Sequence, residues 1–252
     1  MTGGVVQAGP ANLIEAPGTG ERTWSRWPGL RRAPVLNAAA WANVVILAAH
    51  PDDEVLGAGG VISLLASAGS RLRLIAVTDG EASHPGHGDP AALARRRARE
   101  RAGALMALGA ADAEVLRLGL PDSALAGRES DIAAAIEDLT TGFDACLAPW
   151  ESDVHADHEA VGRAAGQVAA PLFFYPVWMW HWARPADPRV PWPRAVRVPL
   201  PAAVADRKRA AIGCFASQLE PRASGAGPVL PARFVNHFTR DYEVLLFLVV
   251  RP

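Results

Sequence analysis

Lysine, cysteine and long apolar segments are scarce in this sequence. The 252-residue chain has a single lysine, Lys208, and two cysteines, Cys146 and Cys214. Two cysteines so far apart in sequence make neither a disulfide framework nor a cysteine-type zinc site. The formal net charge is -1 at pH 7, whereas proteins that bind nucleic acid need a basic face. We therefore expect no nucleic-acid partner.

Segments typical of export or membrane insertion are also missing. The longest apolar runs, Val44 to Ala49 and Val244 to Val250, are shorter than the roughly 20 residues that span a bilayer. The N-terminal residues show no basic segment followed by an apolar one, so we expect no secretory signal. These observations predict a cytoplasmic protein without a transmembrane segment.

The N-terminal region differs in composition from the rest of the chain. Residues 1–20 are rich in Gly, Pro, Ala and Thr and predict a flexible leader. Trp24 and Trp27 follow, and two tryptophans are costly to leave in water. We expect residues 1–40 to form a leader and an arm that packs on a single domain, residues 41–252.

From residue 43 onward, short apolar runs alternate with helix-like segments. The expected strands are residues 43–49, 72–77, 114–118, 144–148, 172–175 and 243–250. The expected helices are residues 54–68, 90–108, 130–141, 157–169 and 201–217. This alternation predicts a Rossmann-like, doubly wound α/β fold, with a mostly parallel sheet and helices on both faces.

Two clusters of histidine and acidic residues follow two of these strands. The sequence HPDDE at residues 50–54 follows the first strand, and HADH at residues 155–158 comes shortly after the fourth. Ligands of open α/β sheets bind beyond the carboxyl ends of the strands. We therefore expect both clusters to meet in an active site at the C-terminal strand edge.

Histidine and carboxylate side chains suit zinc or another divalent metal of similar preference. His50, Asp53 and His158 can supply the three protein ligands of a catalytic zinc ion. Asp52 is then free to act as a general base toward a water molecule. His155 can face a substrate carbonyl and stabilise an oxyanion.

Each cluster taken alone also has a purely structural interpretation. Proline followed by acidic residues is typical of a helix N-terminus, and two histidines at another helix start could be surface residues. The coincidence of both clusters at strand ends favours the metal site. We expect His84 and His87 to be solvated. His181 and His237 are ambiguous from the sequence, and for them we favour a structural role over a ligand role.

Three segments resemble the GlcNAc-phosphatidylinositol de-N-acetylase (PIG-L, LmbE-like) family: AAHPDDEVLGAGG, TDGE and HADHEAVGRAA. The resemblance covers roughly residues 44–169. It implies a Rossmann-like sheet, zinc, and removal of acetyl groups from N-acetylglucosamine units. It also implies metal ligands at His50, Asp53 and His158, the base at Asp52, and the oxyanion-side histidine at His155.

The sequence departs from the family pattern at two positions. Ala156 stands where the family often has proline, and Asp153 stands where mycothiol-pathway relatives have tyrosine. The second change puts tyrosine-assisted oxyanion stabilisation in doubt. The family's Arg-x-x-Glu falls on Arg97 and Glu100, which could instead be an exposed charge pair. Residues 79–81 follow the second strand and could touch sugar hydroxyls.

Several other functions compete with the deacetylase. Gly57, Gly59 and Gly60 could belong to a nucleotide-binding loop, although the acidic residues before them would repel a pyrophosphate. A metal-dependent phosphoesterase usually has two metals and more ligands. A hydrolase of another amide or ester, or an inactive sugar-binding relative, also fits the motifs.

A Pro- and Trp-rich segment, residues 176–201, follows the fifth expected strand. It is either a substrate-facing loop or a covering hairpin, and we expect residues 177–192 to form part of the cleft wall. Its tryptophans could stack on sugar rings or simply cap the fold. These tryptophans are Trp178, Trp180, Trp182 and Trp192.

Overall fold

A computed structural model of the chain describes residues 13–86, 88–168, 171–222 and 225–248. Seven strands form one sheet in the order β3-β2-β1-β4-β5-β7-β6. The strands are β1 (Asn43–Ala48), β2 (Arg71–Thr78), β3 (Glu114–Leu120), β4 (Ala145–Pro149), β5 (Leu172–Tyr175), β6 (Ala195–Pro199) and β7 (Tyr242–Phe247). Strands β1 to β5 are parallel, and β7 pairs antiparallel with both β5 and β6. The mostly parallel sheet is confirmed.

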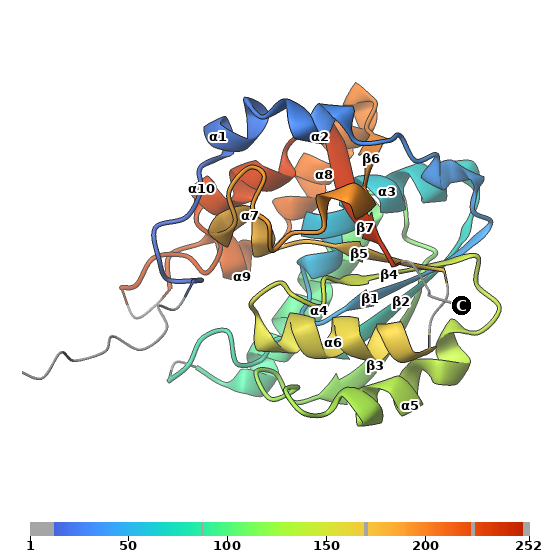
Figure 1. The fold of residues 1–252 in the computed structure, drawn as a ribbon. Helices are drawn as coiled ribbons and strands as arrows, with labels where there is room; N and C mark the ends of the chain where they lie inside the picture. Colours follow the sequence, from blue (N-terminus) through green and yellow to red (C-terminus); the bar gives the residue numbers. More distant parts are fainter. Residues whose placement is uncertain (1–12, 87, 169–170, 223–224, 249–252) are drawn as a thin grey trace, which may run out of the picture.

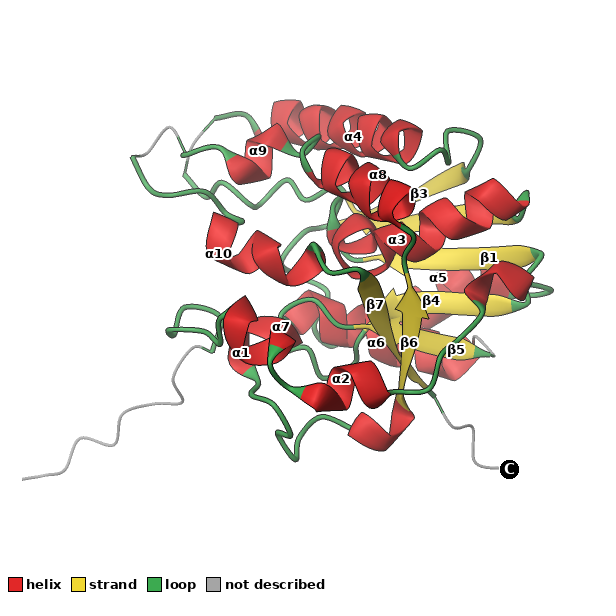
Figure 2. Cartoon of the chain, turned by 90° about the horizontal axis from the view of Figure 1, so that it is seen from above, coloured by secondary structure: helices red, strands yellow, loops and turns green. Residues whose placement is uncertain are grey.

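Helices cover both faces of the sheet, as predicted. Helices α3, α4 and α8 lie on one face, and α5 and α6 lie on the other (Figures 1 and 2). Their bounds are α3 (Asp53–Ala68), α4 (Pro90–Ala107), α5 (Glu129–Thr140), α6 (Ala156–Val168) and α8 (Ala202–Ile212). The shorter helices are α1 (Glu21–Ser25), α2 (Pro28–Arg32), α7 (Met179–Trp182), α9 (Ala216–Leu219) and α10 (Ala232–Val235).

Two details of the C-terminal half differ from the predicted elements. The single helix expected over residues 201–217 is two helices, because α8 ends at Ile212, directly before Gly213, a residue with little helix propensity. The edge strand β6 was not predicted from the sequence. It lies in the Pro-, Trp- and Arg-rich segment, and it pairs with β7 from Ala195 to Pro199.

Strand β1 occupies the position that creates the ligand crevice. Its residues from Val44 onward are all buried, because helices cover both faces. Strand β2 pairs with one edge of β1 and β4 with the other. The order of the strands therefore reverses beside β1, and such a switch point opens a crevice at the carboxyl ends of the strands.

The only lysine of the chain, on α8, contacts the backbone of α3, the helix that follows β1. Lys208 Nζ donates to the carbonyl oxygen of Leu56 at 2.7 Å and to Glu243 Oε1 at 2.5 Å. Glu243 also accepts the backbone N–H groups of Gly60 and Val61, at 2.7 and 2.8 Å. In a regular helix the Gly60 N–H would donate to Leu56. A buried ion pair thus contacts both backbone groups, about one and two turns beyond Asp53.

The N-terminal arm packs on the body around a group of tryptophans. Trp24 is fully buried, and its indole N–H donates to the carbonyl oxygen of Trp180 at 2.8 Å. The rings of Trp27 and Trp192 lie 4.7 Å apart, edge to face. Glu21 adds hydrogen bonds to His237 and Arg240. The arm thus packs on the body, whereas residues 1–12 of the predicted leader lie outside the described residues.

Candidate functional site

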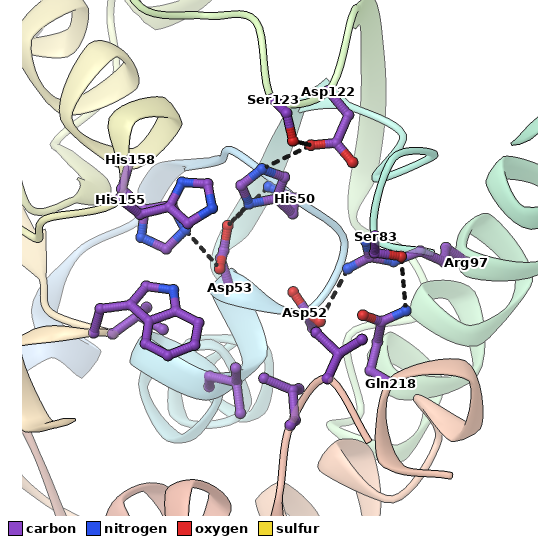
Figure 3. Close-up of a pocket in the computed structure, with 15 residues that line it drawn as sticks. His50, Asp52, Asp53, Ser83, Arg97, Asp122, Ser123, His155, His158 and Gln218 are labelled. Carbon is purple, nitrogen blue, oxygen red and sulfur yellow. Dashed lines mark hydrogen bonds and ion pairs between the residues drawn. The ribbon is translucent and has the colours of Figure 1, made fainter. Parts of the chain in front are cut away.

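The two histidine and acid clusters meet at the carboxyl ends of β1 and β4. HPDDE forms the turn from β1 into α3, and HADH forms the start of α6. His50 Nδ1 lies 3.2 Å from Asp53 Oδ2, and His158 Nε2 lies 3.2 Å from Asp53 Oδ1. The carboxylate of Asp53 therefore lies between the two imidazoles (Figure 3). The three residues predicted as metal ligands are brought together.

In each of these two histidines, the ring nitrogen that faces away from Asp53 contacts another carboxylate. His158 Nδ1 lies 2.8 Å from Asp153 Oδ2. His50 Nε2 lies 3.1 Å from Asp157 Oδ2 and 3.2 Å from Asp122 Oδ1. Carboxylates in this position are typical partners of metal-binding histidines, because they fix the tautomer and the ring orientation.

Asp153 is fully buried and is fixed from several directions. Besides its bond to His158, its carboxylate accepts the backbone N–H groups of Trp178 at 2.9 Å and Met179 at 2.8 Å. It therefore links α6 to the segment that follows β5. Asp153 stands where some relatives have a tyrosine, but here it orients His158 instead of facing the cavity.

The charges around these histidines favour a cation between them. Burial alone would lower the pKa of His158, but the charges of Asp53 and Asp153 raise that pKa to about 9. Burial alone would raise the pKa of Asp53, but His158 and His50 hold this pKa well below its usual range. Carboxylates thus dominate this part of the site, and a divalent cation would satisfy them.

Asp52 lies in the same cavity but outside this ligand group. Its backbone has φ 141° and ψ -28°, a left-handed conformation that is unusual for aspartate. The carboxylate accepts a hydrogen bond from Arg97 Nη2 at 3.0 Å. Burial raises the pKa of Asp52 to about 7, against the opposing charge of Arg97. A carboxyl group with a pKa in this range suits proton transfer near neutral pH.

Arg97 is a buried residue of this site and not part of an exposed charge pair. It is 2% exposed, and its guanidinium also donates to the carbonyl oxygens of Pro51 and Gly80. A Cβ atom on Gly80 would lie 2.0 Å from Arg97 Nη1, so this approach requires glycine. Glu100 does not pair with Arg97. Instead, it bonds to Ser217 and Arg96.

His155 completes the lining on the α6 side. The backbone N–H of Asp157 donates to His155 Nδ1 at 3.3 Å, which leaves the ring proton on Nε2. Burial and the charges of His158 and His50 lower the pKa of His155 to about 3. The imidazole is therefore neutral, and it can donate one hydrogen bond through Nε2.

The donor atoms fit a divalent metal of the zinc type. Nitrogen atoms of His50, His155 and His158 lie within 4.8 Å of one another, and so do ligand atoms of His50, Asp122 and Asp157. Mixed nitrogen and carboxylate oxygen donors are the ligands that zinc accepts at catalytic sites. The described residues thus contain a metal-binding group of histidine and aspartate at the predicted edge of the sheet.

The cavity beside this group has a volume of about 130 Å³. It is lined by His50, Asp52, Asp53, Leu56, Ser83, Arg97, Asp122, Ser123, His155, His158, Val177, Trp178, Gln218, Val229 and Leu230. Val177 and Trp178 confirm that the Trp-rich segment contributes to the cleft wall. The other three tryptophans of the segment pack within the fold, around Trp24 and Trp150.

Several residues considered from the sequence lie outside the cavity lining. Asp79 pairs with Arg117, and Glu81 accepts the backbone N–H of Asp122. His181 and His237 are buried in contacts with the arm, as expected. His84 is partly exposed, and His87 lies outside the described residues.

The glycines do not form a phosphate-binding loop. Gly57, Gly59 and Gly60 lie within α3 and are buried. A Cβ atom on Gly57 would lie 2.2 Å from the ring of Tyr175, and one on Gly60 would lie 2.5 Å from Leu200. These glycines allow close packing of the helix, so the loop on which the nucleotide-binding alternative rested is not formed.

Comparison with known proteins supports the family resemblance. Residues 45–169 match the PIG-L family, described as GlcNAc-PI de-N-acetylase. The chain carries a PIG-L domain. A curated relative, 1D-myo-inositol 2-acetamido-2-deoxy-alpha-D-glucopyranoside deacetylase of Kineococcus radiotolerans, is 36% identical over 117 residues. The match covers 43% of this chain and 32% of the relative, so this chain spans about a third of that protein.

Solved structures show the same fold. N,N'-diacetylchitobiose deacetylase from Pyrococcus horikoshii superposes with a TM-score of 0.56 and 19% identity, over 79% of this chain and 80% of its own. GalB from Pseudomonas putida, a 4-carboxy-2-hydroxymuconate hydratase, superposes with a TM-score of 0.60 and 17% identity. The match covers 83% of this chain and 96% of GalB. The fold alone therefore does not decide the reaction of the PIG-L domain.

Among the described residues, no helix combines the length and the apolar character that a membrane span requires.

Proposed function

We propose that this chain is a zinc-dependent N-deacetylase that hydrolyses the acetamide of an N-acetylglucosamine-type substrate. The observation that carries the proposal is the meeting of His50, Asp53 and His158 beside Asp52, in the crevice between β1 and β4. The PIG-L match and the deacetylase names of the relatives support the substrate class.

The ligand set that we propose is His50 Nδ1, Asp53 and His158 Nε2. The other ring nitrogens of the two histidines contact Asp122, Asp157 and Asp153, so the nitrogens left for a metal are those that face Asp53. Zinc bound there would supply Lewis acidity, which acidifies water and polarises the substrate's acyl oxygen.

The protein side chains then move the protons. Asp52 takes a proton from the attacking water and delivers it to the amide nitrogen as the C–N bond breaks. Arg97 holds the Asp52 carboxylate in place through its hydrogen bond at 3.0 Å. His155 donates from Nε2 to the acyl oxygen, on which negative charge develops.

The remaining alternatives differ in substrate or in activity. Another amide or an ester could undergo the same attack, and acetate release from N-acetylated and O-acetylated sugars distinguishes them. An inactive sugar-binding relative would not need a carboxylate held by Arg97 beside the ligand group, so we favour an enzyme. We also propose a cytoplasmic location, because both cysteines are free, as is usual in reducing compartments.

Replacing His158 by Ala tests the ligand set. The variant should lose both bound zinc and acetate release, because it removes one of three protein ligands. Metal content per chain is measured by mass spectrometry after exhaustive dialysis. His84→Ala serves as the control, because this residue is partly exposed and lies outside the ligand set. Full zinc occupancy in His158→Ala would show that the ligand set is wrong.

Replacing Asp153 by Asn tests the role of the buried carboxylate. Loss of such a partner typically weakens metal binding about 10- to 100-fold, and we expect a loss in that range. Competition with a chromophoric chelator measures the zinc affinity. Asp144→Asn is a matched control, because Asp144 also accepts two backbone N–H groups, at 2.8 Å, but at the other end of the strands. Equal zinc affinity in the two variants would contradict the role of Asp153.

A further inference from the structure

The catalytic cavity opens into a second, larger compartment. This outer compartment has a volume of about 420 Å³, against about 130 Å³ for the inner cavity. Ser83, His155, Trp178 and Val229 line both. Pockets that enclose a small molecule usually measure about 300–1,000 Å³. The inner cavity is therefore too small for a whole glycoconjugate, and the part beyond the acetylated end must extend past Trp178.

The wall between the two compartments is rigid and aromatic. The ring of Trp178 packs on Phe234, with ring centroids 4.5 Å apart, and Phe234 packs in turn on Phe238. The backbone N–H of Trp178 is held by the buried Asp153. Trp178 thus has a fixed orientation at the passage, where it can support a sugar ring.

Two arginines give the outer compartment its charge. Arg222 lines it, and its Nε atom donates to the carbonyl oxygen of Gly227 at 2.9 Å, which orients the guanidinium. Arg233 also lines it, and no ion pair or hydrogen bond joins its side chain to the described residues. Glu15 is the single carboxylate in the lining. The two histidines in the lining, His155 and His181, use a ring nitrogen in hydrogen bonds with backbone groups.

The neighbouring wall is under positive potential as well. Burial and the charges of Arg222, Arg97 and Arg96 lower the pKa of His84, which follows Ser83 in the chain. Arg96 is partly neutralised by Glu100 and Glu220, and Arg97 is paired with Asp52. Arg222 and Arg233 therefore remain as the cations that a ligand in the outer compartment can reach.

We propose that the outer compartment binds an anionic group, a phosphate ester or a carboxylate, on the far part of the amino-sugar substrate. This inference rests on the proposed function and specifies its substrate class. Arginine suits this role, because its planar guanidinium donates two parallel hydrogen bonds to either anion. The sugar crosses Trp178, and its charged substituent lies between Arg222 and Arg233.

Three compounds test the proposal by direct binding to the zinc-loaded protein. They are N-acetylglucosamine 1-phosphate, N-acetylmuramic acid and methyl N-acetylglucosaminide, which carry a phosphate, a carboxylate and no charge, respectively. Calorimetry should show that at least one anionic compound binds about tenfold or more tightly than the methyl glycoside. The preference should shrink at high salt, because exposed charges are screened. The better of the two anions identifies the chemistry of the substituent.

Charge variants assign the preference to these residues. Arg222→Gln and Arg233→Gln should each reduce the preference for the anion, and Glu15→Gln should increase it. Arg99→Gln is the matched control, because Arg99 is an exposed arginine of α4 and lines neither compartment. A merely structural role of the arginines would not produce opposite effects in Arg233→Gln and Glu15→Gln.

The binding results and acetate release have separate consequences. Failure of both anions to bind more tightly than the methyl glycoside overturns the anionic subsite, and so does a preference that survives both arginine substitutions. Acetate freed from the methyl glycoside in that case leaves the deacetylase intact. Conversely, arginine-dependent binding of an anion without acetate release from any of the compounds supports the subsite and contradicts the deacetylase.

Discussion

Asp52→Asn should lower the turnover number about 100- to 10,000-fold while zinc remains bound, because general base catalysis is typically worth that much. Asp52 is 5% exposed, lines the cavity and lies outside the proposed ligand set. Asparagine keeps the shape and can still accept the hydrogen bond from Arg97, but it cannot take a proton. Steady-state kinetics should therefore show a fall in kcat with little change in KM.

Two comparisons make the result specific to Asp52. Asp53→Asn should lose zinc, since Asp53 lies between His50 and His158. Asp138→Asn, an exposed position on α5, should change neither zinc content nor turnover. If Asp52→Asn loses zinc and Asp53→Asn keeps it, the two roles are swapped. Near-normal turnover in Asp52→Asn would mean that another group is the base.

The sequence predicted those parts of the site that depend on strand ends. The apolar run of β1 stops directly before His50, and that of β4 stops shortly before His155. In a parallel sheet this places both clusters at the carboxyl ends of the strands, irrespective of the loop conformations. The ligand and base assignments thus required only the sheet and the chemistry of the side chains.

The residues that orient the ligands could not be predicted in the same way. Asp122 and Asp153 lie in loops, and their contacts with His50 and His158 depend on how those loops close over the sheet. For Asp153 a signal existed, since it replaces the tyrosine of some relatives. For Arg97 the family motif gave a signal, but the charge-rich helix α4 also allowed an exposed position.

The edge strand β6 was missed for a related reason. Its neighbours in sequence are rich in Pro, Trp and Arg, which hide an apolar pattern. Edge strands tolerate such residues, because one side of their backbone has no strand partner. Tertiary pairing with β7 decides this element, and the local sequence does not.

Lys208→Met should destabilise the protein by about 3–5 kcal/mol, because it leaves the Glu243 carboxylate buried without its partner. Lys208 and Glu243 are 3% and 4% exposed. The substitution also removes the donor to the Leu56 carbonyl oxygen in α3, the helix that begins at Asp53. Urea denaturation followed by circular dichroism measures the free energy of unfolding.

Arg209→Met is the matched control on the same helix. Arg209 pairs with Asp206 at the surface, where the two side chains are 49% and 67% exposed, and such pairs contribute about 0–1 kcal/mol. Adding Glu243→Gln to Lys208→Met should recover part of the loss, because a neutral amide is less costly to bury than a lone carboxylate. Glutamine can still accept a backbone N–H from α3 through its amide oxygen. If Lys208→Met costs no more than Arg209→Met, the buried ion pair does not stabilise the helix that carries Asp53.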